Sequence, residues 1–191
     1  MPVILQRGDV RLEPLGQQHA DALAAASADG DIWTLNFTSA PAPDHAAAAA
    51  YIAHALAGQA AGLMLPFAVS VAGQIVGTTR FYDIDDELPC CAIGHTWYAA
   101  RVQRSHVNTC CKRLLLGHAF DALGMRTVRF HTSHLNLRSQ AAIERLGAHK
   151  DGVLRQHKRH KDGSLRDTVC YSILDHEWPA IRDRLDQRLG D

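Results

Sequence analysis

The stretch that decides the fold runs from Ile93 to Phe120. It opens with an apolar, strand-like segment, Ile93-Gly94-His95-Thr96-Trp97-Tyr98. A polar turn, Gln103-Arg104-Ser105-His106-Val107-Asn108-Thr109, then leads into an amphipathic segment that begins at Cys110. A strand, a tight turn and a helix start leave the amides of the first helical turn without acceptors, and the helix dipole favours negative charge there. The pattern predicts an anion site that suits a pyrophosphate.

Length and composition predict one domain over residues 1–191. The chain has 191 residues, 47% of them hydrophobic and 21% charged, which is ordinary for a soluble globular protein. The formal net charge is zero, so nothing global favours nucleic acid or an anionic membrane as a partner. No apolar run reaches the roughly 18 residues of a spanning helix. The N-terminus lacks the layout of a signal peptide, and we expect a cytoplasmic protein.

The cysteines and histidines do not predict a metal site. Cysteines occur at five positions, four of them in the adjacent pairs Cys90-Cys91 and Cys110-Cys111, with Cys170 alone. Adjacent cysteines do not have the spacing of structural zinc ligands, and an ordinary disulfide within such a pair is strained. The twelve histidines are scattered. We therefore expect buried thiols in a reducing compartment and no metal.

Periodicity and turn residues predict an α/β domain (α+β type) with a mixed sheet. The expected order is a strand at 10–15, helices at 17–28 and 43–57, strands at 64–72, 74–83 and 92–98, a helix from Asn108 or Thr109 to Leu123, a strand at 127–133, a helix at 136–146, hairpin strands at 153–160 and 165–174, and a helix at 177–189 capped by Asp175. Ala72-Gly73 and Asp162-Gly163 are the expected hairpin turns.

Four segments in this order resemble the GNAT superfamily of acyl-CoA-dependent N-acyltransferases, and within it the RimJ/RimL-type branch of ribosomal-protein acetyltransferases. They are Ile93 to Trp97, similar to a strand that ends in a bulge; Gln103 to Lys112, similar to the pyrophosphate loop; Asn136-Leu137-Arg138-Ser139 with Ala142 to Ala148, similar to the Asn-x-x-Ser helix; and Gly152 to Arg155 with Arg166 to Leu174, similar to the terminal hairpin. The likeness covers the chain from Arg11 to Trp178.

The resemblance implies a single GNAT-like domain whose mostly antiparallel sheet is split by a V-shaped CoA cleft and flanked by helices. The split lies between the strands at 92–98 and 127–133. Pantetheine would pair there with exposed backbone, and main chain near Trp97 and Tyr98 would polarise the thioester carbonyl. The implied cofactor-binding residues of the loop are Gln103, Arg104, Ser105, His106, Val107, Asn108 and Thr109.

The loop departs from the superfamily pattern Gln/Arg-x-x-Gly-x-Gly/Ala at both glycine positions. Aligned on Gln103, they hold His106 and Asn108. Asn108 suits a helix cap and tolerates a positive φ. The His106 side chain either crowds the phosphates or touches them as an imidazolium. An ordinary capped turn between strand and helix is the alternative for the whole loop.

Asn136 and Ser139 have one reading from local structure and another from the resemblance. Asn136 can cap its helix, with Ser139 at the third helical position. The resemblance implies that Asn136 also steadies the cofactor. It implies that the Ser139 hydroxyl reaches the CoA sulfur, where it hydrogen-bonds or protonates the leaving thiolate.

The general base is not defined by the resemblance. Many members of the superfamily place a glutamate directly before Ile-Gly on the central strand, where this chain has Ala92. His95, expected on the same strand face as Ile93, is the substitute with a suitable intrinsic pKa. A packed strand histidine is the alternative for His95. The acidic loop with Asp83, Asp85, Asp86 and Glu87 could act through water or be a solvated turn.

The resemblance therefore implies an acetyl-CoA-dependent N-acetyltransferase, with Ser139 and His95 as catalytic candidates. Transfer would be direct, from acetyl-CoA as co-substrate to a primary amine on a small molecule, an amino acid or a protein N-terminus. Residues 17–57 and 161–164 would form the acceptor pocket. One alternative is a CoA-binding module that has lost catalysis. The other is an RNA- or ribosome-associated binding protein, which the basic run from Arg155 to Lys161 suggests. We expect no membrane partner, and a homodimer is left open.

Overall fold

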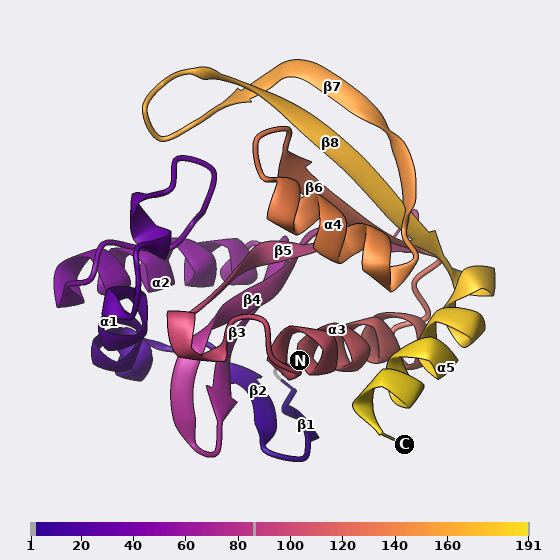
Figure 1. The fold of residues 1–191 in the computed structure, drawn as a ribbon, viewed down its shortest axis with the longest axis horizontal. Helices are drawn as coiled ribbons and strands as arrows, with labels where there is room; N and C mark the ends of the chain where they lie inside the picture. The colour runs from indigo at the N-terminus through magenta and orange to yellow at the C-terminus, as the bar shows by residue number, and fades with distance from the viewer. Residues whose placement is uncertain (1–2, 86, 191) are drawn as a thin grey trace.

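One sheet runs through the part of the chain that the computed structural model describes, residues 3–85 and 87–190. The strand order is β1-β2-β3-β4-β5-β6-β8-β7 (Figure 1). The strands are β1 (Leu5–Arg7), β2 (Val10–Pro14), β3 (Met64–Val71), β4 (Gln74–Asp85), β5 (Cys90–Tyr98), β6 (Thr127–Ser133), β7 (His149–Arg159) and β8 (Leu165–Leu174). Neighbouring strands are antiparallel except for the pair β5–β6. The predicted mixed, mostly antiparallel sheet is confirmed.

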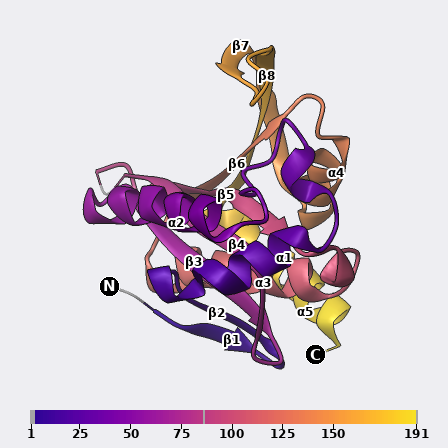
Figure 2. The same ribbon diagram turned by 90° about the vertical axis from the view of Figure 1, so that its left-hand side faces the viewer.

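Helices cover both faces of the sheet. Helices α1 (Ala20–Ala28) and α2 (His45–Ala60) lie on one face, where Tyr51 of α2 bonds Thr78 of β4. Helix α3 (Val107–Gly117) lies on the other face, where His118 of the following turn contacts Phe81 of β4. Helices α4 (Leu137–Leu146) and α5 (Trp178–Leu189) join α3 on that side (Figure 2). The faces on which α2 and α3 lie are called the α2 face and the α3 face below.

The sheet splits because β5 and β6 pair over only three residues. The paired residues are Cys90 to Ala92 and Thr127 to Arg129. Past Ala92 the backbone edge of β5 has no strand partner on that side within the described residues. A bulge bends the same segment, since one residue of β4, Thr79, lies opposite the two residues His95 and Thr96. The predicted V-shaped split is therefore present, and the bulge marks it.

The β7–β8 hairpin rises away from the rest of the sheet (Figure 2), and its turn lies beside the loop before α2 (Figure 1). The Asn36 amide donates to Asp162 at 2.7 Å. The Lys161 ammonium donates to the carbonyl oxygens of Trp33 and Ala40, at 3.1 Å each. Two segments about 120 residues apart in the chain thus close over the same side of the split.

Several helix boundaries differ from the sequence prediction. Helix α3 begins at Val107 with His106 before it, so Asn108 lies inside the first turn and is not its cap. The positive φ of the loop falls on Arg104, at 61°, rather than on Asn108. The α-helix gives way at His118 to a wider π-type turn that ends at Ala122. Asp175 does not cap α5; it begins a short 3-10 turn whose Glu177 side chain accepts from the Leu174 amide.

Helix α2 depends on a side-chain cap, which gives a stability prediction. Asp44 accepts from the Ala47 amide at 2.8 Å and satisfies a first-turn donor. We expect Asp44→Ala to lower the free energy of unfolding by about 1 kcal/mol, measured by urea denaturation. Asp44→Ser keeps a capping oxygen and should recover most of the loss. Equal stability of Asp44→Ala and the parent protein would show that this cap contributes nothing.

Candidate active site

The loop before α3 is held by its own side chains and leaves the helix start open. The Gln103 amide donates to the Tyr98 carbonyl at 2.8 Å, and the Ser105 hydroxyl donates to the Val102 carbonyl at 2.6 Å. The first intrahelical bond runs from the Cys110 amide to the His106 carbonyl. The amides of residues 107–109 precede that bond and have no acceptor within the helix. Val107 turns its amide to Ser105, which leaves those of Asn108 and Thr109 for a ligand.

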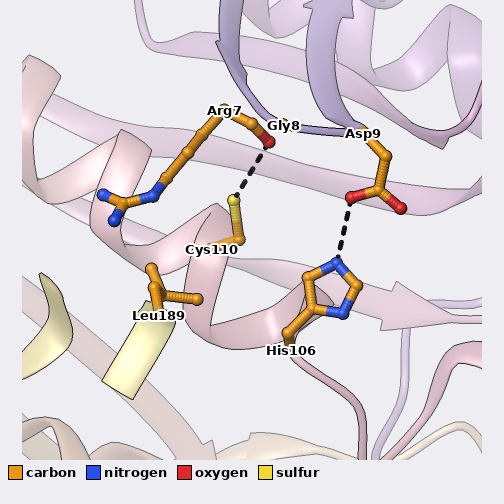
Figure 3. Close-up of a pocket in the computed structure, with 6 residues that line it drawn as sticks. All are labelled: Arg7, Gly8, Asp9, His106, Cys110 and Leu189. Carbon is orange, nitrogen blue, oxygen red and sulfur yellow. Dashed lines mark hydrogen bonds and ion pairs between the residues drawn. The ribbon is translucent and has the colours of Figure 1, made fainter. Parts of the chain in front are cut away.

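The His106 side chain turns away from the anion site. Its Nε2 atom lies 3.1 Å from the carboxylate of Asp9 in the β1–β2 turn, and both side chains are about half exposed (Figure 3). The two residues border a pocket of about 290 Å³ together with Arg7, Gly8, Cys110 and Leu189. The imidazole at the usual glycine position therefore neither blocks the loop nor points at the place where phosphates would lie.

The start of α4 adjoins the start of α3 across the split. The Arg138 guanidinium donates to the Gln103 side chain at 3.1 Å, which joins the two helix starts. Asn136 caps α4 as predicted, since its side chain accepts from the Ser139 amide at 3.1 Å. The Ser139 hydroxyl is not used by that cap, and the residue is half-buried. Two helix N-termini thus converge on one place, and their dipoles add there.

The side chains of Trp97 and Tyr98, near the end of β5, are buried in the core. The Trp97 ring packs edge-on against Tyr51 of α2, with ring centroids 6.4 Å apart. The rings of Trp97 and Tyr98 are therefore not free to contact a ligand, and the contact of their main chain with the pantetheine arm stays a prediction.

The bulge moves His95 to a different face of the sheet from the one predicted. Ile93 pairs with Phe81 and shares the α3 face, whereas the His95 ring packs against Tyr82 on the α2 face at 5.2 Å. The positive φ of His95, 50°, breaks the alternation on which the sequence prediction relied. Tyr82 in turn bonds His131 of β6, with the hydroxyl 3.1 Å from Nδ1.

The surroundings of His95 keep its imidazole neutral. Burial lowers its pKa to about 3, helped by the positive charges of Arg80, Lys158, His54 and Arg166. Neutral imidazole can accept a proton, but these cations disfavour the imidazolium that would form. Burial also raises the pKa of Tyr82 far above its ordinary value, so the phenol keeps its proton.

Among the described residues, no carboxylate acts on His95, either from the usual glutamate position or from the acidic loop. Ala92 is fully buried at the last paired position before the split. Asp83 and Asp85 lie on the outer half of β4, Glu87 follows it, and Asp86 lies outside the described residues. Of the acidic-loop residues that the structure describes, Asp83 acts electrostatically on the neighbouring Tyr82 and His131.

Sequence reasoning missed two buried cations beside the split, Arg80 and Lys112. Arg80 of β4 is 1% exposed, and its side chain extends from the α2 face toward Tyr51. Lys112 extends from α3 between the separating strands, with its Nζ atom 3.2 Å from Thr96 Oγ1 and 5.9 Å from the centre of the Phe130 ring. Only the register of the sheet buries them, and no motif in the sequence marks either residue.

The fold and the site define the class of this protein. A parallel strand pair that opens beside two converging helix starts is an arrangement for a CoA-type diphosphate and its thioester arm. Residues 9–149 match the family model described as acetyltransferase (GNAT) domain. The chain belongs to the GNAT acetyltransferase family, and the predicted enzyme class, an acyltransferase with acetyl-CoA as donor, is confirmed.

Solved structures of acetyltransferases have the same fold as this chain. A GCN5-related N-acetyltransferase from Brucella melitensis is 32% identical, with a TM-score of 0.89 over 98% of this chain and 86% of that one. Mycobacterium smegmatis RimJ, solved in complex with CoA-disulfide, is 21% identical, with a TM-score of 0.81 over 99% of this chain and 94% of that one. RimL, described as a ribosomal L7/L12 α-N-protein acetyltransferase, is 16% identical, with a TM-score of 0.78 over 91% and 95%. At these identities RimJ and RimL show likeness of fold alone. A search of curated proteins found no match.

Two further findings concern features that the described residues lack. None of their helices is long and apolar enough to cross a membrane. No group of three or more histidine, cysteine, aspartate or glutamate side chains among residues 3–85 and 87–190 is placed to hold a metal ion. The five cysteines are free thiols, four of them buried.

Proposed function

We propose that this protein is an N-acetyltransferase that moves the acetyl group of acetyl-CoA directly to a primary amine. The observation that carries the proposal is the separation of β5 and β6 after Ala92, next to the open amides of Asn108 and Thr109 and across from Ser139. The loop from Gln103 to Thr109 would hold the diphosphate through its amides. The convergent start of α4, with Asn136 as its cap, would support the same end of the co-substrate.

The chain's own residues suit each step of the transfer. The free edge of β5 near Trp97 aligns the donor and offers amides to the thioester oxygen. The amine attacks the thioester carbon, a C–N bond forms, the C–S bond breaks, and the amine gives up a proton. We assign to neutral His95, whose ring packs against Tyr82 on the α2 face, the role of taking that proton directly or through water. The Ser139 hydroxyl donates a hydrogen bond to the departing thiolate, or gives it a proton that the serine regains from solvent. No cysteine needs to carry the acetyl group.

The acceptor would enter the split on the side that is bordered by the loop before α2 and the β7–β8 turn. The hydrogen bonds of Asn36 and Lys161 hold these two segments together. A small molecule, an amino acid or a protein N-terminus satisfies the primary-amine requirement. Calorimetry with acetyl-CoA, followed by thiol release across an amine panel, tests the proposal. Absence of acetyl-CoA binding contradicts it, and binding without release for any amine supports the non-catalytic module instead.

The role of Ser139 gives a second mutational prediction. We expect Ser139→Ala to lower kcat by about 10-fold while the Kd of acetyl-CoA changes by less than about 2-fold, since the hydroxyl acts on the leaving group and the helix cap uses only the amide. Ser139→Thr retains a hydroxyl and should recover most of the rate. An unchanged kcat in Ser139→Ala would remove this residue from the mechanism.

A further inference from the structure

Arg80 is a buried cation, and one edge of its guanidinium makes no hydrogen bond to the described residues. The side chain is 1% exposed, its guanidinium lies 5.0 Å from the centre of the Tyr51 ring, and Nη1 points at the sulfur of Met64 at 3.5 Å. Its Nε and Nη2 atoms are buried and have no hydrogen-bond partner within the part of the chain that the structure describes. Among residues 3–85 and 87–190, no carboxylate forms an ion pair with it. Buried donors are rarely left unpaired, so this edge requires an explanation.

The two unpartnered atoms together have the geometry of a carboxylate receptor. Nε and Nη2 form one side of the planar guanidinium, and two parallel N–H groups on one side match the two oxygens of a carboxylate. The atom on the other side, Nη1, is the one turned to Met64. Tyr51 and Met64, which cover the guanidinium, are only half-buried, so a ligand would reach this edge by moving side chains rather than backbone.

The surroundings of Arg80 contain an excess of positive charge. Arg166 of β8 also has a buried Nε without a partner and acts electrostatically on Tyr82. Arg80, Arg166, Lys158 and His54 all act on His95, and no carboxylate is among the groups that do so. Asp83 is the acidic residue that faces the neighbouring pair Tyr82 and His131. A cluster of cations around the reacting amine is suited to an acceptor that brings its own negative charge.

We propose that the acceptor is an amine that also carries a carboxylate, bound by the Nε–Nη2 edge of Arg80 with Arg166 close by. This inference rests on the proposed function, because it specifies the substrate class of the same site. The carboxylate would fix the amine next to His95 and balance the positive charge of the cluster. A negative charge beside His95 also raises its pKa from about 3 toward the ordinary value, so that the imidazole becomes a better base once the acceptor is bound.

Matched acids and amides test the proposal with the unmodified protein. Each of a set of α-, β- and γ-amino acids is compared with its own primary amide at saturating acetyl-CoA, and kcat/KM is calculated for the neutral amine. We expect the best acid to exceed its amide by at least about 100-fold, because a site built for two hydrogen bonds rejects an analogue that lacks them. Equal values for every pair would overturn the proposal.

Substitution of Arg80 assigns the preference to this residue. Arg80→Met keeps the side-chain bulk and should abolish the difference between acid and amide, while the Kd of acetyl-CoA stays within about 2-fold. Arg182→Met, at a partly exposed position on α5, is the matched control and should keep the preference. A preference that survives in folded Arg80→Met contradicts the assignment. If that variant does not fold, the comparison of acids and amides in the parent protein decides.

A binding measurement separates this proposal from the proposed function. N-acetylated amino acids and their amides are titrated into the CoA-saturated protein by calorimetry, which requires no turnover. Tighter binding of the acids, lost in Arg80→Met, supports the carboxylate site even if no amine is acetylated, an outcome that would contradict only the enzymatic proposal. Turnover of amines together with equal binding of acids and amides would support the enzymatic proposal and overturn the carboxylate site.

Discussion

Asn108→Asp should weaken acetyl-CoA binding by about 100-fold. Asn108 is the second residue of α3, half-buried, with an amide that precedes the first intrahelical bond. A carboxylate at this position would lie beside the diphosphate. Two like charges about 5 Å apart repel by roughly 3 kcal/mol at the effective dielectric of a protein surface, which corresponds to about two orders of magnitude in Kd.

The same substitution should not damage the fold. A negative charge in the first turn of a helix interacts favourably with its dipole, so the stability of Asn108→Asp should be equal to or above that of the parent. Calorimetry measures the affinity, and the loss should shrink as ionic strength rises. Asn108→Ser, neutral and compatible with the first turn, is the control and should change Kd by less than about 3-fold.

A truncated donor locates the effect. S-Acetylpantetheine lacks the diphosphate, so Asn108→Asp should bind it as well as the parent does. If the variant loses affinity for both donors alike, the change acts through the structure of α3 rather than through phosphate repulsion. If it binds acetyl-CoA as tightly as the parent does, the diphosphate does not lie at this helix start and the loop assignment is wrong.

The sequence predicted those parts of the fold that local signals specify. Asn136 and Gly147 mark the ends of α4, and Gly163 the β7–β8 turn, because a cap or a positive φ acts on neighbouring residues only. The split of the sheet came from the resemblance, and the pairing of β5 with β6 over three residues bears it out.

The misplaced features depend on partners distant in the chain. His95 changes face because β4 supplies one residue opposite two of β5, and strand alternation alone does not reveal that register shift. The His106 side chain contacts Asp9, 97 residues away in the chain, so its direction could not be predicted from the loop sequence alone. Arg80 and Lys112 read as polar positions of an alternating strand and an amphipathic helix, and only the assembled sheet shows that both are buried.

Lys112→Met should stabilise the protein by about 3 kcal/mol. Lys112 is 6% exposed as a residue, and its ammonium bonds the hydroxyl of Thr96. Burial lowers its pKa from 10.5 to about 8, and each unit of such a shift corresponds to roughly 1.4 kcal/mol against the charged form. Methionine fills a similar volume without a charge, and Thr96 keeps its bond to Thr79. The expected rise in Tm is about 6–12 °C for a chain of this length.

The dependence on pH identifies the cause of this stabilisation. The folded-state pKa of Lys112 lies below the unfolded one, so the unfolded chain binds the extra proton and the penalty is complete below about pH 8. It declines as pH rises from about 8 toward 10.5, and the advantage of Lys112→Met over the parent should decline over the same interval. Urea denaturation at pH 7 and at pH 9.5 gives the two differences.

A buried charge that destabilises the fold is expected only where it serves the site, which links this stability measurement to function. The Lys112 ammonium lies between β5 and β6 where they separate, and through Thr96 it bonds the bulge that positions His95. We therefore expect the more stable Lys112→Met to have a lower kcat/KM. Lys150→Met, at an exposed position on β7, should alter neither stability nor rate. A gain in stability that persists unchanged at pH 9.5 would show that packing, rather than removal of the charge, is responsible.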